Sequence, residues 1–224
     1  MEEMDKTGKT IESYNDCADR FVQVYMDLGL FEKYFREISD LLKEGSTILD
    51  MGCGPGNGAR FFLNQNKGYQ IVGVDLSVEM LQHAKQYAPD ANFILGDIRS
   101  IVFQQTFDAV IASFCIIHLS DNETAVFLRK TFNMLGPGGY LYLSFMCGGI
   151  PGFEKTNFSE QEMFFYYHAP EAITRVLEKT GYRVISSYRR DYQRTVNRTI
   201  RDIVMIVRKP TSCLSQQPAL VGSG

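Results

Sequence analysis

The amino-acid sequence predicts an α/β protein built around a doubly wound, mostly parallel sheet. Short runs dominated by apolar residues, such as residues 70–75 and 107–113, alternate with segments of helical periodicity. The first apolar run ends in Asp50 and enters a turn with glycine at every second position from Gly52 to Gly58, followed by a helix-like segment. Backbone can approach a ligand closely at such a turn, and open α/β sheets bind ligands at the carboxyl ends of their strands. We therefore expect a binding site at this turn.

Composition and charge exclude several classes of protein. The chain has 224 residues, of which 45% are hydrophobic and 12% aromatic, enough for one folded domain with a buried core. The net charge of −3 gives no reason to expect a nucleic-acid or membrane-surface partner, and no apolar run is long enough to span a bilayer. The five cysteines and three histidines are dispersed without metal-ligand spacing, so we expect no metal, no disulfide framework and a cytoplasmic location.

The first 45 residues are expected to form helices that cover the binding site as a lid. Residues 1–10 predict disorder, and their Gly8-Lys9-Thr10 lacks the upstream glycine and the strand of a phosphate-binding loop. Apolar residues recur at helical spacing over residues 11–29 and again over residues 31–42, before Gly45. The sequence thus predicts two amphipathic helices ahead of the first strand.

The remaining elements follow in a regular order over residues 46–208, which we expect to form one domain. Further strands are expected at 70–75, 92–95, 107–113 and 140–146, and at 182–192 and 199–208 as an antiparallel edge pair with a turn near Asn197. Helices are expected at 77–87, 121–134 and 170–180, with Ser77 and Asp121 as N-caps and Gly181 ending the last. A turn is expected at 136–139, a loop at 147–161 and a disordered tail at 209–224.

Acidic residues narrow the choice of ligand. The glycine turn alone also fits a dinucleotide fingerprint, because Gly54, Gly56 and Ala59 have the spacing G-x-G-x-x-A. However, acids end or follow the first three strands, and parallel strands bring these positions to one edge of the sheet: Asp50, Asp75 and Asp97. Each acid alone fits a solvated loop residue. Together they suit a cationic or polyol ligand better than a pyrophosphate, by charge complementarity.

Five ordered motifs resemble those of the class I S-adenosylmethionine-dependent methyltransferases. They are LDMGCGPGNG from Leu49, GVDLS from Gly73 with Met80 beyond it, GDI from Gly96, FDAVIASFCIIHL from Phe107 and LGPGGYLYLS from Leu135. The resemblance covers about residues 46–146, and the final helix and strand pair extend it to about 208. It implies a Rossmann-like sheet of seven strands with an antiparallel last strand. It also implies S-adenosylmethionine as the cofactor and S-adenosylhomocysteine as the product.

The resemblance further implies which residues hold the cofactor. Asp50 would lie near the ammonium group of its methionine part, Asp75 would accept hydrogen bonds from the ribose hydroxyls, and Asp97 would accept one from the adenine amine. The full set of implied cofactor-binding residues is Tyr14, Asp50, Gly52, Cys53, Gly54, Gly56, Asp75, Leu76, Met80, Gly96, Asp97, Ile98, Ser113 and Phe114. For Cys53 the backbone rather than the thiol would matter.

Methyl transfer from a sulfonium is a direct displacement, which needs a base only where the acceptor keeps its proton. His118 is the best candidate for that base, the alternative being a histidine that only positions its loop. Tyr14 begins a segment, YNDCADRF, similar to the lid of small-molecule members of the family, although Asn15 replaces their usual acid. The candidate acceptor-binding residues are His118, Tyr166 and Tyr167; the last two belong to an aromatic run that could instead be a buried strand.

We expect a small-molecule acceptor and a monomer or homodimer. The chain has no basic excess, and residues 113–116 (SFCI) replace the Asn-Pro-Pro-Tyr motif of amide-methylating enzymes. Two alternatives stay open: an NAD(P)-dependent oxidoreductase, although the Tyr-x-x-x-Lys pair is missing, and a cofactor-binding module without activity. The arginines of the last two strands are interpreted as a solvated edge, partly neutralised by Asp191 and Asp202, rather than as a site for an acidic acceptor: Arg183, Arg189, Arg190, Arg194, Arg198 and Arg201.

Overall fold

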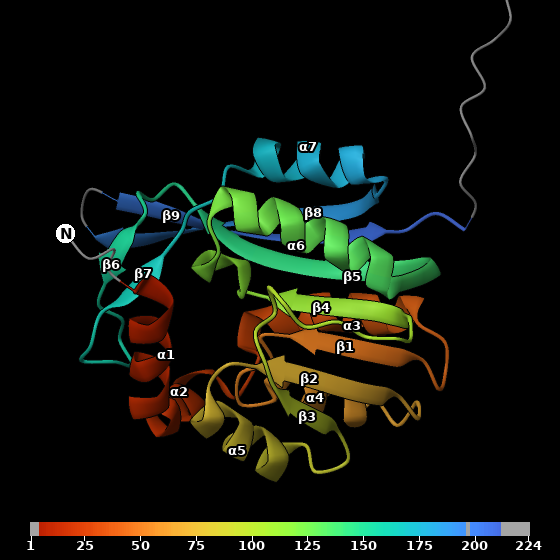
Figure 1. Ribbon diagram of the computed structural model, residues 1–224, viewed down its shortest axis with the longest axis horizontal. Coiled ribbons are helices and arrows are strands. Elements are labelled where there is room, and N and C mark those ends of the chain that lie inside the picture. Colours follow the sequence, from red (N-terminus) through yellow and green to blue (C-terminus); the bar gives the residue numbers. More distant parts are fainter. Residues whose placement is uncertain (1–4, 196–197, 212–224) are drawn as a thin grey trace, which may run out of the picture.

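Seven strands form one sheet in the order β3-β2-β1-β4-β5-β9-β8 (Figure 1). The structure, a computed structural model, describes residues 5–195 and 198–211. Neighbouring strands pair in parallel from β3 to β5, whereas β9 runs antiparallel to both β5 and β8. The predicted fold class is therefore confirmed. The strands are β1 (Thr47–Met51), β2 (Gln70–Asp75), β3 (Asn92–Leu95), β4 (Phe107–Ser113), β5 (Leu135–Cys147), β8 (Arg183–Thr195) and β9 (Arg198–Arg208).

Helices cover both faces of this sheet because alternate strand residues point to opposite sides. Ile48 and Ile111 belong to one buried cluster, with residues of α3 (Glu32–Leu41) and α4 (Asn57–Leu63). Leu49 and Val110 belong to another, with residues of α6 (Asp121–Met134) and α7 (Pro170–Thr180). Helix α5 (Val78–Tyr87) contacts α4 and starts at Ser77, whose hydroxyl accepts from Met80 N as predicted for an N-cap. Two-sided burial explains why the strands are almost continuously apolar.

The N-terminal segment forms α1 (Lys6–Asp16), α2 (Ala18–Tyr25) and a 3₁₀ turn, η1 (Gly29–Phe31). The predicted disorder is wrong for residues 6–10, which form the first turn of α1 with Asp5 as N-cap. The single helix predicted over residues 11–29 is also wrong, because the helix is interrupted at Cys17 and continues as a second helix. Figure 1 shows α1 and α2 facing the carboxyl ends of β1, β2 and β4. The strand ends that carry the predicted site therefore lie beneath these helices.

Three further details differ from the sequence prediction. Ser120, not Asp121, caps α6, because its hydroxyl accepts from Glu123 N and the Glu123 side chain accepts from Ser120 N. The predicted turn at 136–139 lies inside β5, where the pairing with β4 is interrupted. The predicted loop at 147–161 contains β6 (Gly152–Glu154), which pairs with β7 (Met163–Phe165). The β6–β7 pair packs beside α1 and so adds a wall to the site.

The chain ends differ in how far they are described. Lys209 N donates to Gly139 O, so ordered chain continues past the predicted boundary at residue 208. The turn near Asn197, residues 1–4 and most of the predicted tail, residues 212–224, lie outside the described residues.

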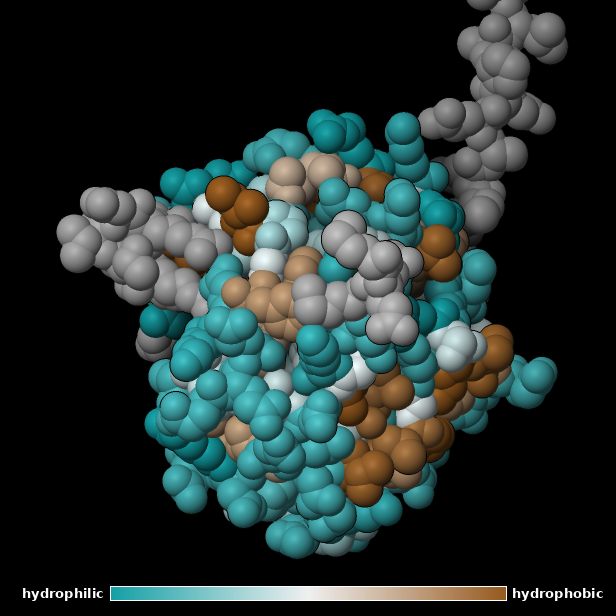
Figure 2. Space-filling view, turned by 60° about the vertical axis from the view of Figure 1, so that its left-hand side comes forward, coloured by the Kyte–Doolittle hydropathy of each residue, from teal (hydrophilic) through white to brown (hydrophobic). Residues whose placement is uncertain are grey.

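None of the helices in the described part has the length and apolar character that a transmembrane span requires. The surface in Figure 2 is largely hydrophilic, with hydrophobic residues gathered on one side. Exposed apolar side chains include Ile94 and Leu95 on the edge strand β3.

Candidate active site

A cavity of about 1350 Å³ lies between α1, α2 and the carboxyl ends of the central strands. It is large enough for a nucleotide cofactor and a second small molecule together. Gly56 and Tyr167 are not among the residues that line it, although both were expected in the site. The predicted site residues that do line it are Tyr14, Asp50, Gly52, Cys53, Gly54, Asp75, Leu76, Met80, Gly96, Asp97, Ile98, Ser113, Phe114, His118 and Tyr166.

The glycine turn forms one side of the cavity with bare backbone. Gly54 has φ +52°, and a Cβ added there would have no atom within 4 Å, so the backbone faces open space. Gly56 has φ +80° at the N-terminus of α4, where a Cβ would lie 3.0 Å from the Cα of Ala84 in α5. Gly54 is thus available to a ligand, whereas Gly56 lets two helices approach each other.

Asp50 is a buried acid without a partner. Its side chain is 3% exposed, and no hydrogen-bond donor reaches its carboxylate among the described residues. Burial and the charge of Asp75 raise the pKa of Asp50 to about 7. A Cβ at Gly58 would lie 2.8 Å from Asp50 Oδ2, so the glycine keeps this oxygen clear. An acid left in this state is stabilised by a cationic ligand.

Asp75 supports the glycine turn. Its Oδ2 accepts from Gly54 N at 2.8 Å and its Oδ1 accepts from Ser77 N at 2.9 Å. Burial raises the pKa of Asp75, and these backbone hydrogen bonds oppose the rise. A carboxylate has about four acceptor positions, so the hydrogen bonds from Gly54 and Ser77 do not use its full capacity. Such a group can hold a pair of hydroxyls.

Asp97 has a strong partner that the sequence analysis missed. Arg99 Nη2 lies 2.7 Å from Asp97 Oδ2, and Arg99 Nε lies 2.9 Å from the same oxygen. Burial disfavours ionisation of Asp97, but the hydrogen bonds from Arg99 outweigh it and hold the pKa of Asp97 below its usual value. Arg99 Nη1 also donates to Glu123 on α6 and to Thr7 on α1. Arg99 therefore joins α1, the site edge and α6.

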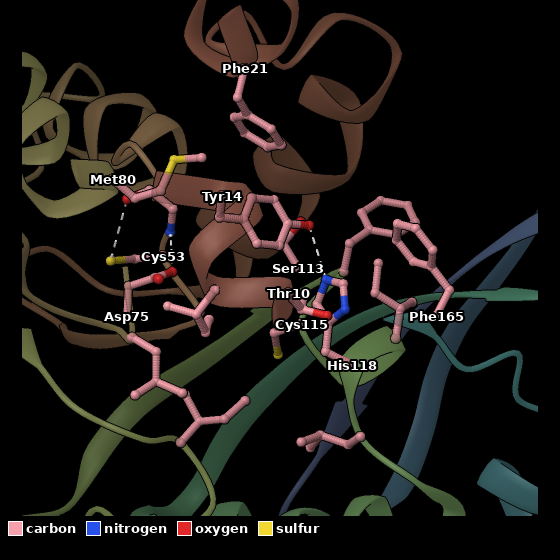
Figure 3. A pocket seen from close by; sticks show the side chains of 18 of the residues that line it. Thr10, Tyr14, Phe21, Cys53, Asp75, Met80, Ser113, Cys115, His118 and Phe165 are labelled. Atoms are coloured by element: carbon pink, nitrogen blue, oxygen red, sulfur yellow. Dashed lines mark hydrogen bonds between the residues drawn. The ribbon is translucent and has the colours of Figure 1, made fainter. Parts of the chain in front are cut away.

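Tyr14 and His118 meet across the cavity (Figure 3). The Tyr14 hydroxyl lies 2.9 Å from His118 Nε2, while His118 Nδ1 lies 2.9 Å from the carbonyl oxygen of Phe164. Because a carbonyl only accepts, Nδ1 carries the proton and Nε2 accepts from Tyr14. Burial lowers the pKa of His118 to about 4 and raises that of Tyr14. Both side chains are therefore neutral at pH 7.

Aromatic rings form much of the remaining wall. Phe21 and Phe158 pack against Tyr14, and Tyr25 packs against both of them, with ring centroids 5.0–6.2 Å apart. The aromatic run at residues 164–168 begins in β7 and divides: Phe164, Phe165 and Tyr166 line the cavity, whereas His168 is buried and does not line it. The Tyr167 hydroxyl donates to Glu154 on β6 instead.

Phe114, directly after β4, has an unusual backbone for a bulky residue, with φ +53°. Its N–H donates to Ser144 Oγ at 3.0 Å and to Ser144 O, and its ring packs edge-on against Phe31. Residues held in this region of φ cost of order 1–3 kcal/mol, and they collect at functional sites. The tertiary structure thus holds this ring against the cavity.

The described arginines of the sheet edge fit the solvated edge expected from the sequence only in part. Arg189 pairs with Glu171 at 3.7 Å and Arg201 with Asp191 at 2.9 Å, both on the surface. Arg183 is exposed, and only Arg190 of the described set lines the cavity. The side chains of Arg194 and Arg198 lie outside the described part of the chain. In the same part, no three His, Cys, Asp or Glu side chains gather as metal ligands would.

The sequence also resembles known proteins. Residues 48–139 match the family described as "Methyltransferase domain". Phosphoethanolamine N-methyltransferase of Triticum aestivum is 31% identical over 186 residues, which cover 78% of this chain and 36% of that protein. Trans-aconitate 2-methyltransferase of Azoarcus sp. (strain BH72) is 33% identical over 100 residues, which cover 45% of this chain and 39% of that protein. The chain thus spans little more than a third of either relative.

The fold has close counterparts among solved structures. The magnesium protoporphyrin IX methyltransferase of Synechocystis PCC 6803, with bound S-adenosylmethionine, superimposes with a TM-score of 0.69 at 16% identity. The match covers 93% of this chain and 99% of that one, which shows a shared fold. Residues 48–139 therefore carry a methyltransferase domain, and the fold around them is shared with solved S-adenosylmethionine-dependent methyltransferases.

Proposed function

We propose that this protein transfers a methyl group from S-adenosylmethionine to a small-molecule acceptor. Asp50 carries this proposal, because a buried carboxylate without a donor, beside open glycine backbone, suits the ammonium group of the cofactor. Asp75, with acceptor positions left over from Gly54 and Ser77, suits the two ribose hydroxyls. These two carboxylates therefore fit a cationic nucleoside better than a dinucleotide.

The other cofactor contacts follow from the same placement. Leu76 and Met80 would flank the adenine, and the Ile98 backbone would donate to its ring. Asp97 would receive the adenine amine only beside Arg99, which already donates to both of its oxygens. Cys53, Gly52, Gly56 and Gly96 would shape the backbone, while Ser113 and Phe114 would face the reacting end. We propose residues 1–45 as a lid over this site.

The chemistry asks little of the protein beyond alignment, exclusion of water and removal of a proton. S-adenosylmethionine supplies a methyl group on a positively charged sulfur, and the carbon–sulfur bond breaks with its electron pair going to sulfur. The acceptor lone pair forms the new bond to carbon. A proton leaving the acceptor would pass to the Tyr14 oxygen as the Tyr14 proton moves to His118 Nε2. We propose His118 as the final proton acceptor and Tyr14 as the group that contacts the substrate.

The acceptor is proposed as a small molecule because the lid and the β6–β7 pair enclose the cavity. The two relatives are named for acceptors of different chemistry, an amine and a tricarboxylate, so their names alone do not choose between them. Tyr166 lies where it would touch the acceptor. A cytoplasmic location and a monomeric or homodimeric state stay predictions.

Calorimetry with S-adenosylhomocysteine and, separately, with NADH tests the cofactor. We expect micromolar binding of S-adenosylhomocysteine and none of NADH; binding of NADH alone would support the oxidoreductase alternative. Asp75→Ala should weaken S-adenosylhomocysteine binding at least about tenfold, the scale of a charge-assisted hydrogen bond. Asp90→Ala, an exposed acid beyond α5, is the matched control. Binding without methyl transfer to any of a panel of amines, alcohols, thiols and carboxylates would favour the non-catalytic module.

A further inference from the structure

Part of the cavity lining beside β9 has, apart from Phe114, no role in the proposed binding of the cofactor. We call it the β9 chamber and define it by five lining residues: Phe31, Phe114, Met146, Arg190 and Asp202. Asp202 pairs in register with Met146 of β5. Because β9 runs antiparallel to β5, the first residues of β9 lie beside the carboxyl end of β5. The chamber is therefore on the edge of the sheet that carries the site, toward the acceptor side.

Asp202 is an isolated acid in this chamber. It is only 8% exposed, and the neighbours on its face of the strand, Val204 and Ile206, are buried apolar residues. Among the side chains that the structure describes, none forms a hydrogen bond or ion pair with its carboxylate. Burial raises the pKa of Asp202 to about 6, and the charge of Arg190 opposes that rise. At pH 7 and above the carboxylate is therefore mostly ionised.

Arg190 forms no ion pair with Asp202, although the two are register partners on β8 and β9. The Arg190 side chain is exposed, and its guanidinium carbon lies 5.9 Å from the centre of the Phe31 ring. Because Arg190 is exposed, water solvates its guanidinium group. The buried carboxylate of Asp202 has lost most of its hydration. Asp202 is thus the charge that a bound cation would stabilise.

The walls indicate what kind of partner fits. Phe31 and Phe114 present aromatic rings, which attract cations, and Met146 adds a soft apolar surface. A carboxylate at the end of an aromatic chamber selects a positive charge on an apolar or small carbon body. We propose that Asp202 binds a protonated amine of the methyl acceptor, which makes the acceptor a small amine. This inference rests on the proposed function and names its substrate class.

The test compares amines with neutral molecules of the same shape. Ethanolamine and ethylene glycol form one pair of probes, and benzylamine and benzyl alcohol form another. Their affinities are measured by ligand-observed NMR with the wild-type protein, both with and without S-adenosylhomocysteine. We expect each amine that binds to do so at least tenfold more tightly than its alcohol, and we expect this preference to vanish in Asp202→Asn. Asp202→Ser provides a second variant should the first fold poorly.

The control is Asp191→Asn, which removes an exposed acid from the neighbouring strand and should keep the preference for amines. S-adenosylhomocysteine affinity should be the same in all variants, because Asp202 is assigned to the acceptor. The proposal is overturned if neither amine binds better than its alcohol, or if Asp202→Asn keeps the preference. Failure of S-adenosylhomocysteine to bind would instead count against the proposed function, since the amine comparison is also made without it.

Discussion

The hydroxyl of Tyr14 on α1 lies 2.9 Å from Nε2 of His118, in the turn after β4. The Phe164 carbonyl fixes the His118 proton on Nδ1, so the hydrogen bond has a direction: Tyr14 donates and His118 accepts. Helix α1 and the turn after β4 are thus joined by one hydrogen bond.

Removing the tyrosine hydroxyl should stop proton transfer while leaving cofactor binding intact. For Tyr14→Phe we expect kcat to fall about 100-fold, the usual scale of general acid–base catalysis, and S-adenosylhomocysteine affinity to change less than threefold. Steady-state kinetics and calorimetry separate the two effects. Tyr87→Phe, on the surface of α5, controls for loss of a tyrosine hydroxyl. Wild-type kcat in Tyr14→Phe would show that the proton leaves by another route.

Asp50 should make both stability and cofactor binding depend on pH near 7. Its pKa is about 7 in the folded protein and about 3.9 in an unfolded chain, so the folded state binds more protons. The Asp50 contribution to the free energy of unfolding should therefore fall as pH rises from about 4 to 7, by at most about 1.4 kcal/mol per pH unit, and Asp50→Asn should remove this contribution to the slope. Urea unfolding at several pH values measures it.

The same group has the opposite effect on the ligand. An ammonium group needs the ionised carboxylate, so S-adenosylhomocysteine affinity should rise about tenfold per pH unit below 7 and level off above it. In Asp50→Asn affinity should be weak and flat with pH. A wild-type profile whose only break is near pH 4 would mean that His118, not Asp50, controls binding.

The backbone at Phe114 predicts an unusual order of stability. Because φ is +53°, Phe114→Gly should be more stable than Phe114→Ala by about 1 kcal/mol, since glycine adopts this conformation without strain. Phe165, in β7 with ordinary backbone, is the matched control: there the alanine variant should be the more stable one. Denaturant midpoints of the four variants decide. Equal order at both positions would show that Phe114 is not strained.

Arg99 should hold the lid closed. Its contacts with Asp97, Glu123 and Thr7 are lost in Arg99→Ala, so amide hydrogen exchange in α1 should speed up several-fold and S-adenosylhomocysteine should bind more weakly. Arg36→Ala, which breaks an exposed pair with Glu32 on α3, should change neither. Unchanged exchange in α1 would mean that its contacts with β7 suffice.

Elements with a one-dimensional signature could be predicted from the sequence. The bounds of β2 and β4 match because burial on both faces produces an apolar run, and α7 matches because Pro170 and Gly181 mark its ends. The bounds of β3 also match, although this edge strand is partly exposed. The start of α1 could not be predicted. Its buried face includes Thr10 and Ser13, whose hydroxyls bond to residues of the distant β7 region, so no apolar pattern marks it.

The site divides in the same way. Asp50 and Asp75 could be placed because parallel strands bring their ends together. Arg99 was missed because its role depends on α1 and α6 meeting at one point. Asp202 was interpreted as neutralising arginines, and only the register of β9 with β5 reveals that it lines the cavity.

The break at Cys17 has a consequence for timing. It separates α1, which carries Tyr14, from α2, so a movement of α1 alone would carry Tyr14 with it. The first group of the proposed proton relay would then move together with the helix that covers the cavity. With α1 moved away from the cavity, the protein could bind its methyl donor and its acceptor. Tyr14 and His118 would then be apart, so they could not activate a water molecule in the open cavity. In each turnover, closure of the cavity by α1 and formation of the Tyr14–His118 hydrogen bond would then occur at the same step, and both would be lost when α1 moved away again.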